Sequence, residues 1–432
     1  MLRRASVVLL VLVPAALGWV ALTPQSEVAL ARNLLLYPVE PFWRPFAPVA
    51  GAGSGMLRGT ARSAQGLSLA NTTVVAAAED GRAFTALSDA SGRYELALPV
   101  GSYVPVATHA GFEDAPLRWG PLRGAVSIAP GEDAAADFFL SPAAPHPFFA
   151  GGPLTFLDDT TSHTDIPQPV DVRRRGFTLE RAGVTLTGSL VYEPPGTATL
   201  PVLLFIYPCW TYPCSVLGFD ALSAAVAARG YIVVAYSPQR GLDLEADMDD
   251  VLTLLAHIRA NQLSARGNGS RVALLTGSLT SIHVWRVVQL APPGTVQAVV
   301  VLGGLSDLFL IRERFEAGAL RLEPPFDEPL SNALVALGRP NLNPDFYVRY
   351  SPVYHIDALN NTSLSLIYGG KDKIVPPEQT AHFSQQLFAR GIAHEVHLYP
   401  DQEHYLDLST LNPDELDMFE QVVGFLRRRL GK

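Results

Sequence analysis

The sequence predicts an α/β fold with a doubly wound, mainly parallel sheet, preceded by a small β-sandwich and an N-terminal hydrophobic helix. From residue 170 onward, apolar runs of strand length alternate with helical patterns, as expected where helices cover both faces of a parallel sheet. Residues 56–141 contain short apolar runs separated by Gly, Ser and Asp turns, which is typical of a small all-β module. An uncharged apolar run covers residues 5–22.

Composition limits the classes of function. The chain has 432 residues, of which 48% are hydrophobic and 17% charged, so it can bury large cores and form two or three domains. Its net charge is −9 and it has no long basic run, which excludes nucleic acid as an expected partner. The two cysteines and the histidines show no metal-ligand spacing, so neither a metal nor another cofactor is expected.

The N-terminus has the pattern of an export signal. Arg3 and Arg4 precede the apolar run, and Ala29-Leu-Ala31 offers a cleavage site. The run is also long enough to span a membrane. Residues 1–31 are therefore predicted to be a signal peptide or a retained membrane anchor, followed by a linker over 32–55. Both alternatives place the chain outside the cytoplasm, whether periplasmic, at the cell surface or secreted.

The first folded module is predicted over residues 56–141. Its motifs are SDASGRY at 88–94 and LPVGSY at 98–103, each with strand-like runs beside it. The module resembles the carboxypeptidase regulatory-like domain, a transthyretin-like sandwich. The resemblance implies an accessory role without catalysis. Residues 142–169, rich in Pro, Gly, Thr and Asp, are predicted to form a linker.

The α/β domain is predicted over residues 170–432. It opens with a hairpin over 176–192. Apolar runs that predict buried strands cover residues 201–207, 231–236, 271–275, 296–302, 364–368 and 395–399. Helical patterns cover residues 217–229, 247–261 and 282–290. Each module has its own apolar strands, so this domain is expected to stay folded without residues 56–141.

Six motifs of this domain are similar to those of one family. They are ARGYIVV at 228–234, GGLSD at 303–307, YSPVY at 350–354, IYGGKDKIVP at 367–376, LFARG at 387–391 and YPDQEH at 399–404. The domain resembles the catalytic domain of the prolyl oligopeptidase family. This resemblance implies an α/β-hydrolase fold and acyl transfer by a serine, an acid and a histidine.

The stretch RVALLTGSLTS at 271–281 is the candidate nucleophile elbow. It combines a strand, a sharp turn and a helix, and it places Ser278 as the nucleophile. The usual elbow has glycine two residues before and after the serine, whereas this chain has Thr276 and Thr280. Their side chains are expected to strain the turn or crowd the helix against the sheet. A shifted register would make Ser281 the nucleophile instead.

The other catalytic candidates follow in the chain order of α/β-hydrolases, which is Ser, then Asp or Glu, then His. Asp372 follows one buried strand and His404 follows the next. Both stand where the resemblance implies the family's acid and base.

The oxyanion hole is predicted to use the N–H of Leu279 and a second donor after the 201–207 strand. Pro208 has no N–H, so the second donor is expected to be Cys209, Trp210 or the Tyr207 hydroxyl. Cys209 and Cys214 are also predicted to form a disulfide, because export exposes the pair to an oxidising compartment.

Two functions remain open at this stage. The first is hydrolysis of a small peptide or ester through an acyl-enzyme, by a peptidase or a carboxylesterase. The second is a non-catalytic accessory or binding protein at the cell surface or in a membrane complex, because the elbow glycines are replaced. Residues 309–346 are expected to set specificity.

Overall fold

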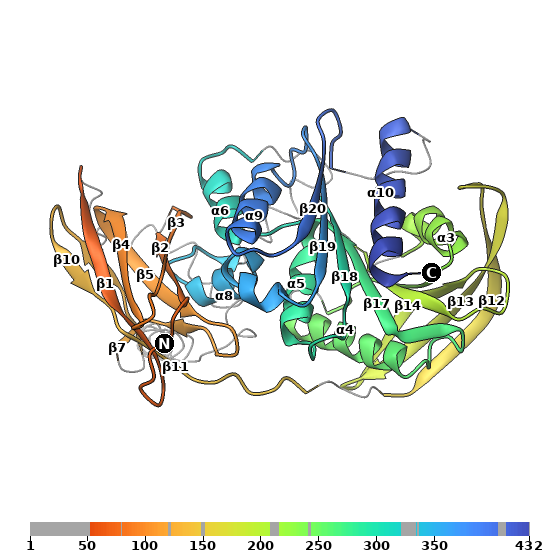
Figure 1. Cartoon of the computed structure of the whole chain (residues 1–432), viewed down its shortest axis with the longest axis horizontal. Helices are drawn as coiled ribbons and strands as arrows, with labels where there is room; N and C mark the ends of the chain where they lie inside the picture. The colour runs from red at the N-terminus through yellow and green to blue at the C-terminus, as the bar shows by residue number, and fades with distance from the viewer. Residues whose placement is uncertain are drawn as a thin grey trace, which may run out of the picture. The chain divides into compact units, whose positions relative to one another are not determined.

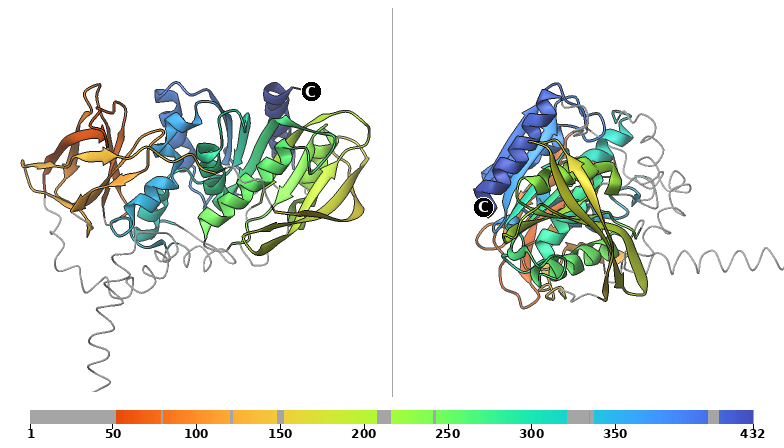
Figure 2. Two further views of the ribbon diagram at one scale, coloured as in Figure 1. Left: turned by 90° about the horizontal axis from the view of Figure 1, so that it is seen from below. Right: turned by 90° about the vertical axis from the view of Figure 1, so that its right-hand side faces the viewer.

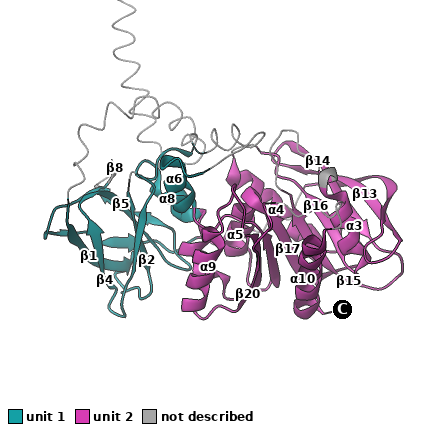
Figure 3. Ribbon diagram, turned by 90° about the horizontal axis from the view of Figure 1, so that it is seen from above, with its two compact units in different colours: residues 1–143, 308–349 teal, residues 144–307, 350–432 magenta. Residues whose placement is uncertain are grey.

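The computed structural model describes residues 52–78, 80–119, 122–147, 152–207, 216–240, 243–320, 334, 337–404 and 412–431. The predicted hydrophobic helix within residues 1–31 lies outside these ranges, and so do the linker up to residue 51 and both cysteines. Within the described ranges, no helix is both long and apolar enough to cross a membrane. The chain divides into two compact units, Met1–Ala143 with Leu308–Arg349, and Ala144–Asp307 with Tyr350–Lys432 (Figure 3).

The first unit contains the predicted β-sandwich. One sheet is built on β1 (Ser54–Ser63), which pairs with β4 (Arg93–Pro99), β10 (Asp133–Ala135) and β11 (Phe138–Leu140). The other sheet has the order β3 (Ala83–Leu87), β2 (Thr73–Ala78), β5 (Gly101–Thr108) and β6 (Ala115–Pro116), with β9 (Val126–Ile128) also on β5. A short ribbon joins β7 (Arg118–Trp119) to β8 (Leu122–Arg123). Alternate residues of β4 (Tyr94, Leu96 and Leu98) are buried in the sandwich core, as expected of a strand with one solvated face.

A segment distant in sequence completes this unit. Helices α6 (Leu308–Glu316) and α8 (Pro344–Arg349) lie in the same compact unit as the sandwich, and α8 packs against β5 and β6. At Gly81, with φ of 98°, a Cβ atom would lie 2.4 Å from the backbone nitrogen of Glu313. The structure therefore differs from the predicted boundary, which assigned 308–349 to the α/β domain. A pattern of strands and helices cannot show that the chain leaves one unit and later returns.

The second unit is built on a nine-stranded sheet (Figure 1). The strands, in spatial order, are β12 (Leu154–Thr164), β13 (Val170–Arg181), β14 (Val184–Glu193), β16 (Ile232–Tyr236), β15 (Leu200–Ile206), β17 (Gly267–Gly277), β18 (Ala298–Leu302), β19 (Ser363–Gly369) and β20 (His394–Tyr399). Every pair from β16 to β20 is parallel, and the pairs from β12 to β16 are antiparallel. The predicted α/β class and mainly parallel sheet are confirmed, and the arrangement is that of an α/β-hydrolase.

Strand β12 is a correction to the predicted linker over 142–169. Its Asp, Thr and Ser residues indicated a loop, but they belong to an edge strand that pairs with β13. Most of them face solvent, whereas Ser162 and Thr164 are buried. Side chains reinforce the pairing, because Arg173 donates to Asp159 at 2.7 Å and Arg174 donates to the Thr160 hydroxyl at 3.0 Å. Cross-strand pairs of this kind stabilise a sheet edge.

Helices cover both faces of the sheet (Figure 2). On one face, α3 (Asp220–Ala228), preceded by the 3-10 turn Val216–Phe219, shares a core cluster with α10 (Pro413–Leu430). On the other face, α4 (Leu244–Arg259) and α5 (Ser281–Leu290) pack against β17 and each other. Helix α9 (Glu378–Ala389) packs on β20.

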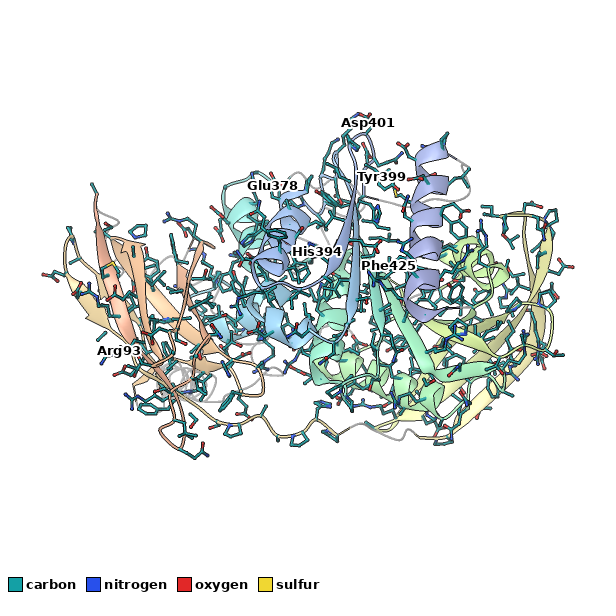
Figure 4. All side chains as sticks on the ribbon, viewed as in Figure 1. Arg93, Glu378, His394, Tyr399, Asp401 and Phe425 are labelled. Atoms are coloured by element: carbon teal, nitrogen blue, oxygen red, sulfur yellow. The ribbon has the colours of Figure 1, made fainter. Side chains whose placement is uncertain are left out.

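Side-chain alternation along β20 shows the two faces directly. His394, labelled in Figure 4, contacts Ser384 of α9 at 2.8 Å, whereas the next residue, Glu395, accepts from Arg428 of α10 at 2.6 Å. Since successive side chains of a strand point to opposite faces, α9 and α10 cover opposite sides of the sheet. The parallel strands β17 to β20 all end at the same edge, where ligands bind in open α/β sheets.

Candidate active site

Ser278 lies at the carboxyl end of the central strand β17, in the sharp turn before α5. A 3-10 turn, Ser278–Thr280, joins the strand to the helix. The backbone of Ser278 has φ of 51°, a left-handed conformation that is uncommon for a residue with a side chain. Such a conformation costs on the order of 1–3 kcal/mol and persists where the surrounding structure imposes it. A serine held in a strained strand-to-helix turn is the defining feature of a nucleophile elbow.

Asp372 and His404 meet Ser278 at this edge of the sheet. The Nε2 atom of His404 lies 2.8 Å from the Oγ atom of Ser278, and its Nδ1 atom lies 2.6 Å from Oδ2 of Asp372. The other carboxylate oxygen accepts the N–H groups of Ile374 at 2.9 Å and Val375 at 2.8 Å. A carboxylate at Nδ1 favours the tautomer that carries its proton there, and in that tautomer Nε2 can accept the serine proton.

The His404 and Asp372 side chains are almost fully buried, at 3% and 1% exposed. Gly303, at the end of β18, makes room for them. It has φ of 52°, and a Cβ atom there would lie 3.2 Å from Oδ2 of Asp372 and 3.3 Å from Nδ1 of His404. Gly303 belongs to the GGLSD motif at 303–307, and its role at the site was not predicted from the sequence.

The two threonines that replace the elbow glycines are hydrogen-bonded to each other. Thr276 and Thr280 are buried, and their Oγ1 atoms lie 2.9 Å apart. The Thr280 hydroxyl also lies 2.8 Å from the carbonyl oxygen of Gly277 and 3.2 Å from that of Ile206, the last residue of β15. The sequence predicted strain or crowding at these two positions, and these hydrogen bonds were not predicted from it.

Ser281, the alternative nucleophile, does not face His404. Its hydroxyl is fully buried, donates to the carbonyl oxygen of Ser278 at 2.6 Å and accepts the N–H of Leu305 at 2.8 Å. Both of these partners are backbone groups of the turn and of the segment after β18. The geometry thus brings Ser278, and not Ser281, to the histidine.

The predicted oxyanion donors are only partly described. The N–H of Leu279 lies in the first turn of the elbow, among the amides that a helix start leaves without an internal partner. Tyr207 is fully buried, and its hydroxyl contacts the Ser223 hydroxyl and lies 3.3 Å from the carbonyl oxygen of Phe219. Burial raises the pKa of Tyr207 above its usual value. The structure therefore does not bring the Tyr207 hydroxyl to Ser278.

The remaining predicted donors, Cys209 and Trp210, lie outside the described residues, as does Cys214. Their participation in the oxyanion hole and the Cys209–Cys214 disulfide stay predictions. Among the residues that the structure describes, no group of three or more His, Cys, Asp or Glu side chains is arranged to hold a metal ion.

A buried carboxylate anchors the segment that follows Gly303. Asp307 accepts from the Tyr354 hydroxyl at 3.2 Å, and its other oxygen lies 3.6 Å from Nδ1 of His382. The side-chain amide of Gln379 in α9 binds the backbone of Asp307 twice. It accepts the Asp307 N–H at 2.8 Å and donates to the Asp307 carbonyl oxygen at 2.8 Å. The Asp307 carboxylate raises the pKa of His382, and burial raises that of Tyr354. These bonds fix the loop that makes room for His404.

Two family models match the chain. The carboxypeptidase regulatory-like domain matches residues 56–141, and the prolyl oligopeptidase family matches residues 326–432. The second match contains both Asp372 and His404. The C-terminal part of the chain is therefore similar to the prolyl oligopeptidase family of serine hydrolases. Both resemblances drawn from the sequence are thereby confirmed, and the hydrolase carries its regulatory-like module on the N-terminal side.

Solved structures similar to this chain include peptidases and esterases. Acylaminoacyl peptidase of Pyrococcus horikoshii has 13% identity and a TM-score of 0.49, covering 84% of this chain and 62% of that chain. A puromycin-hydrolysing peptidase of Mycobacterium tuberculosis has 14% identity and a TM-score of 0.47, covering 85% and 64%. A bacterial esterase of the hormone-sensitive lipase family has 19% identity and a TM-score of 0.47, covering 60% and 85%. No curated protein matches the chain in sequence.

Proposed function

We propose that this hydrolase cleaves a small peptide or ester substrate through an acyl-enzyme, with Ser278 as nucleophile, His404 as base and Asp372 as the group that orients the histidine. The observation that carries the proposal is the short contact of 2.8 Å between Oγ of Ser278 and Nε2 of His404, made by a serine with φ of 51°. A buried serine and histidine in contact, with a carboxylate behind the histidine, is the arrangement that activates a hydroxyl as a nucleophile.

The reaction divides into two steps. Oγ of Ser278 attacks the substrate carbonyl while Nε2 of His404 takes its proton, and the resulting oxyanion accepts the N–H of Leu279. The intermediate collapses to a seryl ester, and His404 gives its proton to the leaving amine or alcohol. A water molecule then attacks the ester by the same route and frees Ser278. Asp372 stays ionised and stabilises the imidazolium that forms in each step.

We also propose that the reaction takes place outside the cytoplasm, with the N-terminal apolar run either removed as a signal or kept as a membrane anchor. The motive is the pattern of Arg3 and Arg4 before residues 5–22. Recovery of protein starting near Arg32 from a soluble extracytoplasmic fraction would support removal. Recovery of intact protein in the membrane fraction would support the anchor, and recovery in the cytoplasm would contradict both.

The activity is tested by comparing wild type with Ser278→Ala on a chromogenic short-chain ester and on peptide anilides, at matched melting temperatures. The substitution is expected to lower kcat by about 10³-fold or more, because the triad acts as a unit. A fluorophosphonate probe should label wild type at Ser278, with the modified peptide identified by mass spectrometry. Ser281→Ala serves as the register control and should still carry the label at Ser278.

Equal rates for wild type and Ser278→Ala, together with no labelling of wild type, would contradict the proposal. That result would favour a hydrolase-like protein kept for binding or assembly. Labelling at Ser281 would instead mean that the nucleophile had been assigned one turn too early.

A further inference from the structure

The geometry points to Thr276, Thr280 and Ser281 as positioning residues that hold the strained backbone of Ser278 and aim the oxyanion donor. The inference rests on the proposed function, since it concerns how the proposed nucleophile is held. Thr276 and Thr280 stand where an elbow of this kind is expected to have glycines, Ser281 follows Thr280 directly, and all three residues are buried. None of them contacts His404 in a described hydrogen bond, so they act through the backbone of the turn.

The first contribution fixes the peptide unit that precedes Ser278. Thr280 is 2.8 Å from the carbonyl oxygen of Gly277, which belongs to the peptide joining Gly277 to Ser278. A carbonyl oxygen can only accept, so the single Thr280 proton is donated to a carbonyl, and Thr276 donates to the Thr280 hydroxyl at 2.9 Å. A second carbonyl within 3.2 Å of Thr280, that of Ile206, connects the turn to the end of β15.

The second contribution fixes the peptide unit that follows Ser278. The Ser281 hydroxyl donates to the carbonyl oxygen of Ser278 at 2.6 Å. Because a peptide unit is planar, this carbonyl and the N–H of Leu279 belong to one rigid group and point in opposite directions. The bond from Ser281 therefore sets the direction of the N–H that is predicted to bind the oxyanion.

Together the two contributions determine the conformation of the nucleophile. The φ and ψ angles of Ser278 describe the rotation between its two flanking peptide planes. The Thr280 hydroxyl is hydrogen-bonded to the peptide before Ser278, and the Ser281 hydroxyl to the peptide after it. Glycine would leave this turn more freedom. Here the left-handed conformation, with φ of 51°, is held by side-chain hydrogen bonds.

Gly304, on the segment after β18, leaves space for the side chain of Ser281. A Cβ atom at Gly304 would lie 2.2 Å from Cγ1 of Val301, 2.9 Å from Cβ of Ser281 and 3.1 Å from its Oγ. The chain thus has the bulkier residue on the elbow and the glycine on the facing segment after β18.

The experiment removes hydroxyls while keeping side-chain volume. Thr280→Val is expected to lower kcat on a short-chain ester about 10- to 100-fold with KM changed less than about threefold, because a misplaced reacting atom affects the chemical step. The second-order rate of fluorophosphonate labelling should fall in parallel. Thr280→Ser, which keeps the hydroxyl, should stay within about threefold of wild type. Thr253→Val is the matched control, since it removes a buried hydroxyl that donates to a backbone carbonyl of α4 at 2.8 Å, and should leave kcat within about twofold.

The double variant Thr276→Val/Thr280→Val separates positioning from stability. Thr280→Val alone leaves the buried Thr276 hydroxyl without its partner, which destabilises the fold, whereas replacing both by apolar groups of the same shape removes that penalty. The double variant should therefore have a higher melting temperature than Thr280→Val, whereas its kcat should stay as low as that of Thr280→Val. Recovery of rate and melting temperature together, or wild-type kcat in Thr280→Val, would overturn the inference while leaving the proposed function intact. A wild type that neither hydrolyses esters nor takes the label would overturn the proposed function, and with it this inference.

Discussion

Replacing Gly303 with alanine is expected to slow the reaction although none of the three candidate catalytic residues is itself substituted. The new Cβ would lie 3.2 Å from Oδ2 of Asp372 and 3.3 Å from Nδ1 of His404. Ordinary heavy-atom contacts are about 3.5–4.0 Å, so this pair must give way by a few tenths of an ångström. A displacement of about 1 Å costs on the order of 10²-fold in rate. The shift at this pair is therefore expected to lower kcat about five- to tenfold, with KM little changed.

The same substitution also changes stability, and a control separates the two effects. Gly303 has φ of 52°, where a side chain costs about 1–2 kcal/mol, equivalent to a fall in melting temperature of about 2–8 °C for a domain of this size. Gly294 has φ of 77° but nothing within 4 Å of a Cβ atom. Gly294→Ala should thus share the loss of melting temperature and keep the wild-type kcat.

The assay is steady-state hydrolysis of a short-chain ester by both variants, with active enzyme counted by phosphonate titration and melting followed by calorimetry. If Gly303→Ala is as fast as Gly294→Ala, the Asp372–His404 pair does not depend on the space at Gly303. The account of how the segment after β18 supports the site would then be refuted.

Three further outcomes are expected. Asp372→Asn should lower kcat by about 10⁴-fold, because an amide stabilises the wrong tautomer of the histidine; a loss below tenfold would contradict the orienting role. Mass spectrometry of protein from an oxidising compartment should find Cys209 and Cys214 joined, a bond that needs their Cα atoms within about 7 Å; two free thiols would contradict it. Gly81→Val should destabilise the first unit, since its Cβ would lie 2.4 Å from the backbone nitrogen of Glu313; a calorimetric transition unchanged from wild type would argue against that contact.

The site residues that could be inferred from sequence are those fixed by chain order. Ser278, Asp372 and His404 each follow a strand, and parallel strands bring their carboxyl ends to one edge. The hydroxyl pair Thr276 and Thr280 could not be inferred in the same way, because the sequence shows only that two glycines are missing. Whether such residues crowd a turn or bond across it depends on distances that appear only in three dimensions.

The fold was predictable where the pattern is local. Buried runs such as Val233–Ala235 identify central strands through composition alone. Strand β12 was missed because an edge strand with polar residues on both faces has the composition of a loop. The position of 308–349 was missed for another reason, because membership of a compact unit depends on contacts far apart in sequence.

The return of residues 308–349 to the unit that begins at the N-terminus has a consequence for biosynthesis. The ribosome finishes the sandwich segment at residue 143, but the segment that completes its unit ends about 200 residues later, at residue 349. At about 5–20 residues per second, the delay is roughly 10–40 s. During that time the surfaces of β5 and β6 that pack against α8 have no partner from their own chain. A chaperone has this interval in which to shield them, and the sandwich must keep its fold until α8 has been synthesised.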